Sequence, residues 1–227
     1  MNRFLKWAAL LLLINFTAFG ASCLPGTLLD YVNLGADGCR AGAVQFNNFE
    51  LAMVQSGAME IAPGSVQITP VGDLYHPTFR VTLNQMANAG QLLESMFRFN
   101  STGLLSGASV SLIGAQATGD GAVTGSVEVC PGGNFMGVEP IGCNTSPQSA
   151  IAFVIEGDAE PNASTPPFQI SSFFDVFVDL TVDGGLTGSA MLSSAEVGVS
   201  AVPEPHSAFL IAAGVLVLGC QRLRTRS

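Results

Sequence analysis

Histidine is the side chain that most often serves as a general base, and residues 21–202 contain one, His76. It lies in the turn-like stretch Tyr75-His76-Pro77, whereas the other histidine, His206, belongs to the C-terminal tail. A nucleophilic serine or cysteine needs a base beside it, yet no Gly-x-Ser-x-Gly or His-Glu-x-x-His motif occurs. We therefore expect His76 to be a loop residue without a catalytic task, and the chain not to be an enzyme.

Paired carboxylates are a second arrangement that does chemistry, because glycosidases need only two acids about 5–10 Å apart. Asp175, Asp179 and Asp183 share one face of an expected strand. Neighbours along that strand are four residues apart, which is roughly 13 Å and too far for joint action. We expect these aspartates to keep an exposed face hydrated.

Glu156, Asp158 and Glu160 alternate along a short acidic segment. Residues with this spacing can converge on Ca²⁺ if the chain curls into a loop. The glycine of this segment does not lie where a known calcium loop has its glycine, and no bidentate glutamate follows at the end. A plain acidic loop is the favoured interpretation, calcium is the alternative, and no cofactor is expected.

Four cysteines lie between residues 21 and 202, and they allow three disulfide pairings. The favoured pairs are Cys23–Cys39 and Cys130–Cys143, since each brackets a loop rich in glycine or proline. Each closed loop should stabilise the fold by ~3 kcal/mol. Zinc is disfavoured because no Cys-x-x-Cys motif and no nearby histidine are present.

Alternating apolar and polar residues predict strands along most of the chain. Apolar residues at alternate positions of 174–182 predict one long strand that ends in the turn at 183–185, and the unbroken apolar run 151–155 predicts a central strand covered on both faces. Residues 108–112 and 123–129 should form a hairpin through the turn at 119–121.

One stretch, residues 83–94, has a helix-like pattern. We expect nine to eleven strands separated by Gly, Pro and Asn turns. This spacing predicts an all-β fold, an antiparallel β-sandwich or jelly roll, over residues 21–200.

The same region is strongly acidic. Three arginines stand against sixteen acids between residues 21 and 202, which gives a net charge of −13. Such a surface repels phosphate backbones and anionic lipid, so we expect no nucleic-acid partner. Charged residues make up 11% of the chain, below the usual ~25%, and Ser, Thr and Gly take their place, as in secreted β proteins.

The N-terminus has the pattern of a secretory signal peptide over residues 1–20. Arg3 and Lys6 precede the apolar run 7–19, which is too short to span a membrane. Small residues follow, so we expect signal peptidase to cut after Gly20, with Ala21 as the alternative site. Cys23 raises a lipoprotein alternative.

The C-terminal segment 201–227 begins with Val202-Pro203-Glu204-Pro205. The prolines fix φ and predict an extended, exposed strap. An expected transmembrane helix at about 206–221 follows, and Arg222, Arg224 and Arg226 form a basic tail in 222–227 that should stay cytoplasmic. A simple tail anchor that is never cut is the alternative.

This order of motif, apolar segment and terminal arginines closely resembles the PEP-CTERM sorting domain of exported Gram-negative proteins. The resemblance implies recognition and cleavage by an exosortase, a membrane-embedded cysteine protease-transpeptidase, often in bacteria that build exopolysaccharide. More faintly, residues 23–27, 34–39 and 46–49 resemble acidobacterial-type PEP-CTERM ectodomains, which implies a β fold and no particular activity.

The sequence therefore predicts a non-enzymatic protein of the cell surface or extracellular matrix. It should leave through the Sec machinery, remain as an inner-membrane-anchored intermediate with residues 21–200 in the periplasm, and reach the surface after exosortase processing. A module that binds glycan or exopolysaccharide is the main alternative, and a secreted hydrolase with paired acids is the least favoured one.

Overall fold

A computed structural model describes residues 21–136 and 142–203 of the chain. Within those residues it is almost entirely β structure, with fourteen strands and one short helix. The strand pairs are antiparallel except for β4 (Met59–Glu60), which runs parallel to β7 (Leu92–Ile113). The all-β, antiparallel expectation is confirmed. The strand count exceeds the predicted one because several strands have only two or three residues.

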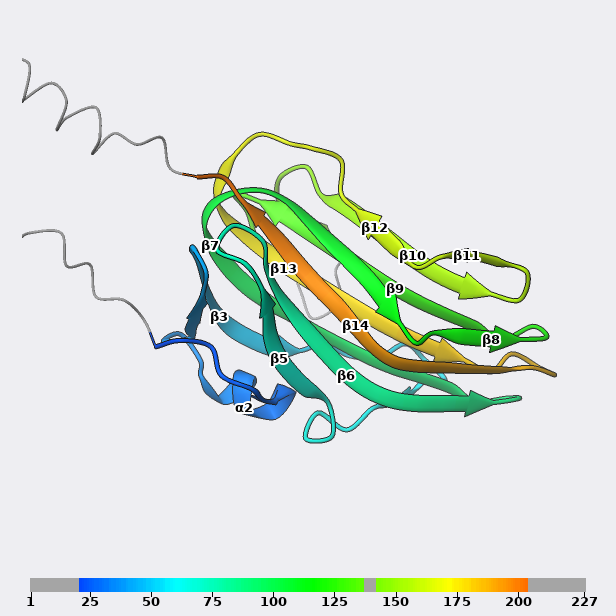
Figure 1. Cartoon of the computed structure of the whole chain (residues 1–227). Helices are drawn as coiled ribbons and strands as arrows, with labels where there is room; N and C mark the ends of the chain where they lie inside the picture. The colour runs from blue at the N-terminus through cyan, green and yellow to red at the C-terminus, as the bar shows by residue number, and fades with distance from the viewer. Residues whose placement is uncertain (1–20, 137–141, 204–227) are drawn as a thin grey trace, which may run out of the picture.

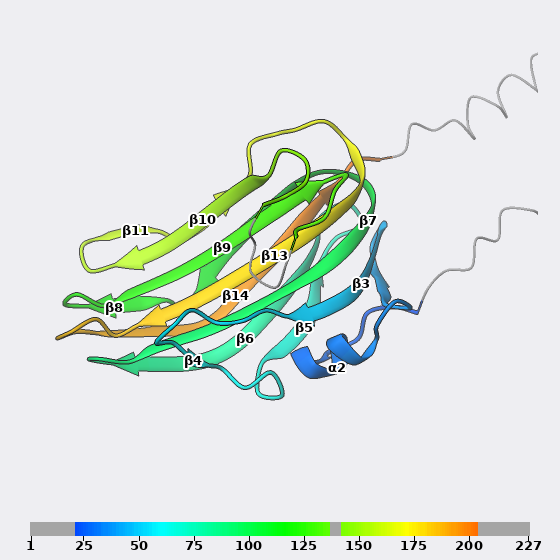
Figure 2. The same ribbon diagram turned by 180° about the vertical axis from the view of Figure 1, so that it is seen from behind.

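The strands form two facing layers that share β7, as Figures 1 and 2 show from opposite sides. In the first layer, β14 pairs with β6 on one side and with the second half of β7 on the other. The strands of this layer besides β7 are β1 (Gly26–Thr27), β5 (Gln67–Gly72), β6 (Pro77–Asn88), β8 (Gln116–Thr118), β12 (Asn162–Ser164) and β14 (Ser189–Ala201).

The second layer is built around β13, which pairs with the first half of β7 and, on its other side, with β9. β3 lies on the far side of β7, and β10 and β11 extend the layer beyond β9. The strands of this layer besides β4 and β7 are β2 (Cys39–Ala41), β3 (Val44–Leu51), β9 (Ala122–Pro131), β10 (Gln148–Ile155), β11 (Asp158–Glu160) and β13 (Ser171–Asp183).

β7 passes from one layer to the other near its middle. Its residues 92–105 pair with β13 and residues 105–113 pair with β14, and the register of both partners shifts opposite residues 102–107. Gly103 and Gly107 lie in this stretch. Residues without a Cβ accommodate such irregularities, so the bend falls where the backbone is least restricted.

The main core lies between the layers. Alternate residues of β13 point into it, and each of them is fully buried: Phe174, Val176, Val178, Leu180 and Val182. At one end the core is aromatic, with Phe46 and Phe79 in edge-to-face contact at 4.7 Å and Phe49 stacked on Phe99 at 5.0 Å.

The helix prediction was wrong in position. Residues 83–94 form the end of β6, a turn and the start of β7, because pairing with β14 overrides the local pattern. Asn84, at φ 50°, lies where the register with β14 shifts, and this irregularity breaks the period of two.

The helix is α2 (Leu28–Asn33) instead, and it buries Leu28 and Tyr31 in the core. Its N-terminus has a capping box: Thr27 Oγ1 accepts from the Asp30 N–H at 3.1 Å, and the Asp30 carboxylate accepts from the Thr27 N–H at 2.8 Å. Burial raises the pKa of Tyr31 to about 12. Its hydroxyl donates to the carbonyl of Leu24 at 2.8 Å.

Two further strand expectations need correction. Residues 108–112 pair with β14 and β12 rather than with 123–129, because the turn at 119–121 joins β8 to β9. Residues 151–155 belong to β10, next to the layer's edge, where Ile151 is 59% exposed. A continuous apolar run therefore marks a strand with one uncovered face here.

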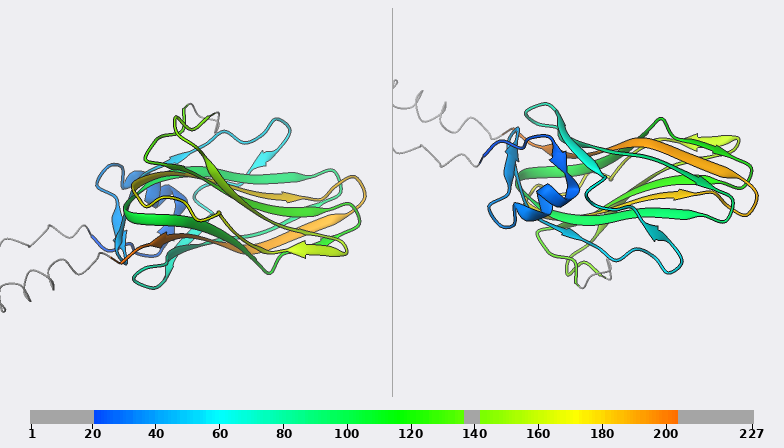
Figure 3. Two further views of the ribbon diagram at one scale, coloured as in Figure 1. Left: turned by 90° about the horizontal axis from the view of Figure 1, so that it is seen from above. Right: turned by 90° about the horizontal axis from the view of Figure 1, so that it is seen from below.

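The first and last described residues lie at the same end of the molecule (Figures 1 and 3). The last backbone contacts of the domain are made by Ala201 and Val202, whose N–H groups donate to Tyr75 and Leu104 at 2.7 and 2.6 Å. The expected signal peptide (1–20), Glu204 and Pro205, the transmembrane helix (206–221) and the basic tail (222–227) lie outside the described residues. Among the residues that are described, no helix has the length and apolar character needed to span a bilayer.

Candidate functional site

Both predicted disulfides are present, and they close very different segments. Cys23–Cys39, with Cα atoms 4.8 Å apart, joins the segment before α2 to β2, and Cys39 is part of the main core. Cys130–Cys143, with Cα atoms 5.4 Å apart, closes the connection between β9 and β10 on the outer face of the second layer. Two disulfides indicate an oxidising, extracytoplasmic environment.

His76 lies in the exposed turn between β5 and β6, beside Asp73. The Asp73 carboxylate accepts from the N–H groups of Tyr75 and His76, each at 2.8 Å. These hydrogen bonds lower the pKa of Asp73. The hydrogen bonds to Asp73 have the arrangement of an Asx turn, so the pair stabilises the turn.

The aspartates of β13 do not form the hydrated face that the sequence predicts. Asp175 is 3% exposed, and its Oδ2 accepts from the Phe135 N–H at 2.9 Å. Phe177, two residues on, is also buried, against Phe135 and Met96. Phe135, from the connection that follows β9, covers this part of the outer face, and the alternation of residues along β13 does not reveal this.

Sequence reasoning also missed acids that come together across strands. Asp179 lies opposite Met96 and Ser126, so Glu94 on β7 and Glu128 on β9 are its diagonal neighbours on the same face. Burial raises the pKa of Glu94 and of Glu128, and the charge of Asp179 raises both further. Only the pairing register of the three strands brings these acids together, because they are far apart in sequence.

Glu94 is fully buried and also holds the segment between β3 and β4. Its Oε2 accepts from the Gln55 N–H at 2.5 Å, and its carbonyl accepts from the Ile61 N–H at 2.8 Å. This role is structural. In residues 21–136 and 142–203, no group of three or more His, Cys, Asp or Glu side chains is placed to hold a metal ion.

The calcium candidates lie around the turn from β10 to β11. Asp158 and Glu160 belong to the exposed strand β11, and Glu156 instead bonds the N–H of Gly119 in the turn between β8 and β9. The three carboxylates therefore do not form a described metal cluster. Calcium binding by this segment stays a prediction.

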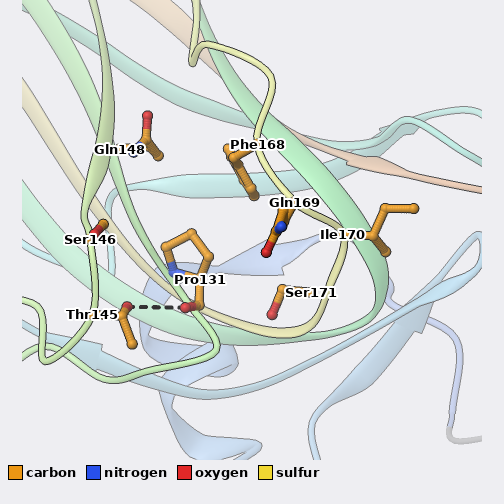
Figure 4. Close-up of a pocket in the computed structure, with 8 residues that line it drawn as sticks. All are labelled: Pro131, Thr145, Ser146, Gln148, Phe168, Gln169, Ile170 and Ser171. Carbon is orange, nitrogen blue, oxygen red and sulfur yellow. Dashed lines mark hydrogen bonds between the residues drawn. The ribbon is translucent and has the colours of Figure 1, made fainter.

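An open pocket of about 360 Å³ lies beside the second disulfide. Thr145, Ser146 and Gln148 line one side and residues 168–171 line the other, with Pro131 between them (Figure 4). The Thr145 hydroxyl donates to the Pro131 carbonyl at 3.0 Å and so fixes the floor of the pocket.

The chain matches no protein-family model and no curated protein. One solved structure is similar over part of its length: the enzymatically active domain of tailspike protein 4 of bacteriophage CBA120, at 11% sequence identity and a TM-score of 0.26. The match covers 66% of this chain and 19% of that chain. A likeness of this size supports no inference about fold or function.

Proposed function

We propose that this chain is an exported, non-enzymatic protein of the cell surface or extracellular matrix: a disulfide-stabilised β-sandwich that an exosortase sorts through its C-terminal motif. The observation that carries the proposal is the pair of disulfides in an all-β domain. Disulfides persist in oxidising compartments, and the acidic, lysine-free segment 21–202 suits a soluble exterior.

The position of the motif supports the same proposal. β14 ends at Ala201, and Val202 is still hydrogen-bonded to the domain. Pro203, Glu204 and Pro205 therefore follow the domain directly, with no linker of their own. A protease that reads the charge of Glu204 and the fixed shape of the two prolines would act beside a folded body, and would release it without an extended tail.

A matched pair of variants tests the sorting step in a producing Gram-negative cell. Glu204→Ala should leave the protein in the inner-membrane fraction with its tail uncut, because the charge in the recognition strap is lost. Glu160→Ala, in the exposed strand β11, should be sorted like the wild type. Equal distribution and equal length of wild type and Glu204→Ala would contradict exosortase sorting.

A further inference from the structure

The pocket beside the second disulfide has fixed walls. Pro131 follows Cys130 directly, and the N–H of Gly132 donates to the Phe173 carbonyl at 2.8 Å. On the opposite side, the ring of Phe168 packs against the buried ring of Phe174 at 5.1 Å. Walls that are held by a cross-link, hydrogen bonds and core contacts need little ordering when a ligand binds.

Three polar side chains that line the pocket are free to bind a ligand, although the hydroxyls of Thr145 and Ser171 are already hydrogen-bonded. The carboxamides of Gln148 and Gln169 and the hydroxyl of Ser146 make no hydrogen bond with any residue that the structure describes. Gln148 is on β10 and Gln169 is in the connection from β12 to β13, so two separate segments each present a free amide to one pocket (Figure 4). A carboxamide both donates and accepts hydrogen bonds.

The side chains that line the pocket carry no charge, although the region 21–202 carries a net charge of −13. No side chain in the lining neutralises the charge of a phosphate, a carboxylate or a cation. Apolar surface is present as well, from Pro131, Phe168 and Ile170, the last of which is 56% exposed.

From these observations we infer that the pocket binds a neutral sugar residue of a polysaccharide. A pyranose ring has an apolar C–H face for Phe168 and Ile170, and its adjacent hydroxyls both donate and accept, as the two carboxamides do. The volume is at the small end of ligand pockets and suits one or two rings. The inference does not depend on how the chain is exported or sorted.

Titration calorimetry of the full chain in detergent tests this site. The probes are neutral hexasaccharides (maltohexaose, cellohexaose, mannohexaose and xylohexaose) and, as the charged counterpart, an alginate hexamer. At least one neutral probe should bind, and the alginate hexamer should bind more weakly than it. Gln148→Ala and Gln169→Ala should each weaken binding by about three- to tenfold, as expected for one lost hydrogen bond.

Gln116→Ala is the matched control, because Gln116 is an exposed glutamine of β8 at the opposite end of the molecule (Figure 1). It should bind the neutral probe as the wild type does. Failure of every neutral probe to bind, or equal affinity of the pocket variants and the control, would overturn the inference. Preferential binding of an uncharged peptide that both pocket variants weaken would overturn it too, in favour of a peptide site.

Discussion

The two faces of β13 belong to one strand but are buried in different ways. The inner face meets the opposite layer, and five alternate apolar residues are fully buried there. The outer face carries Asp175, Phe177 and Asp179, and it is covered in part by Phe135 from the segment that Cys130–Cys143 closes. The inner face depends on a layer of strands, whereas the outer face depends on one cross-linked connection.

This difference shows which contacts should be rigid. The inner residues pack against strands held by continuous ladders on both sides. Phe177 packs in a small separate cluster with Ala52, Met96, Cys130 and Phe135. We expect the outer cluster to be the part that loosens first when the protein is perturbed.

The largest effect is expected from shortening a residue on the inner face. Phe174→Ala should lower the free energy of unfolding by about 3–5 kcal/mol, because the close-packed core cannot collapse around the cavity. Phe177→Ala is the matched change on the outer face. It should lower the free energy of unfolding by less, because Phe135 can relax into the space that the ring leaves. Urea unfolding midpoints measure both; an equal or larger loss for Phe177→Ala would contradict the comparison.

Removing the second disulfide should have the next largest effect. Replacing Cys130 and Cys143 by serine should lower the free energy of unfolding by about 3 kcal/mol, because the unfolded chain gains conformational freedom. It should also loosen the contact of Phe135 with Phe177. In that background Phe177→Ala should add little further loss, while Phe174→Ala should keep its full cost. A double-mutant cycle measures this coupling. If the losses of unfolding free energy from Phe177→Ala and from removal of the disulfide were additive, the disulfide would not be what holds Phe135 against Phe177.

The smallest effect concerns charge on the outer face. Burial raises the pKa of Asp179 in the folded protein. The contribution of this group to stability is therefore complete below the ordinary aspartate pKa and is lost as the pH rises through the folded-state pKa. Asp179→Asn should unfold at higher urea than the wild type at pH 7, with the difference disappearing near pH 3; a lower midpoint at pH 7 would contradict this.

Asp120 provides a control of opposite sign. Hydrogen bonds from the N–H groups of Thr187 and Leu186 lower its pKa to about 2. Its contribution to stability is present above the ordinary aspartate pKa and is lost as the pH falls through about 2. Asp120→Asn should therefore unfold at lower urea than the wild type at pH 7, and unchanged behaviour would show that this link between two turns is unimportant.

Local pattern predicted the inner half of the fold. The alternation along β13 and the turns after it and before β9 can be read from neighbouring residues, as can both disulfides, whose partners are close in sequence. The sequence analysis missed α2, although Thr27 and Asp30 have the spacing of a capping box. These features depend on residues that are close together in the chain, so they can be predicted from one sequence.

Features that arise from pairing between distant segments were not predictable. Glu94, Glu128 and Asp179 meet only because β7, β13 and β9 lie side by side in one register. The exposure of Ile151 depends on how many strands lie beyond β10. The pocket lies where the connections before β10 and before β13 meet, and no motif in either segment marks it.

The intact mass of the protein recovered from a producing Gram-negative cell, measured with and without reduction, tests the central claim most directly. The account predicts a chain that begins at Ala21, ends near Pro203, and gains four hydrogen masses on reduction of its two disulfides. A chain that still contains Cys220 and the terminal arginines would contradict processing of the tail by an exosortase.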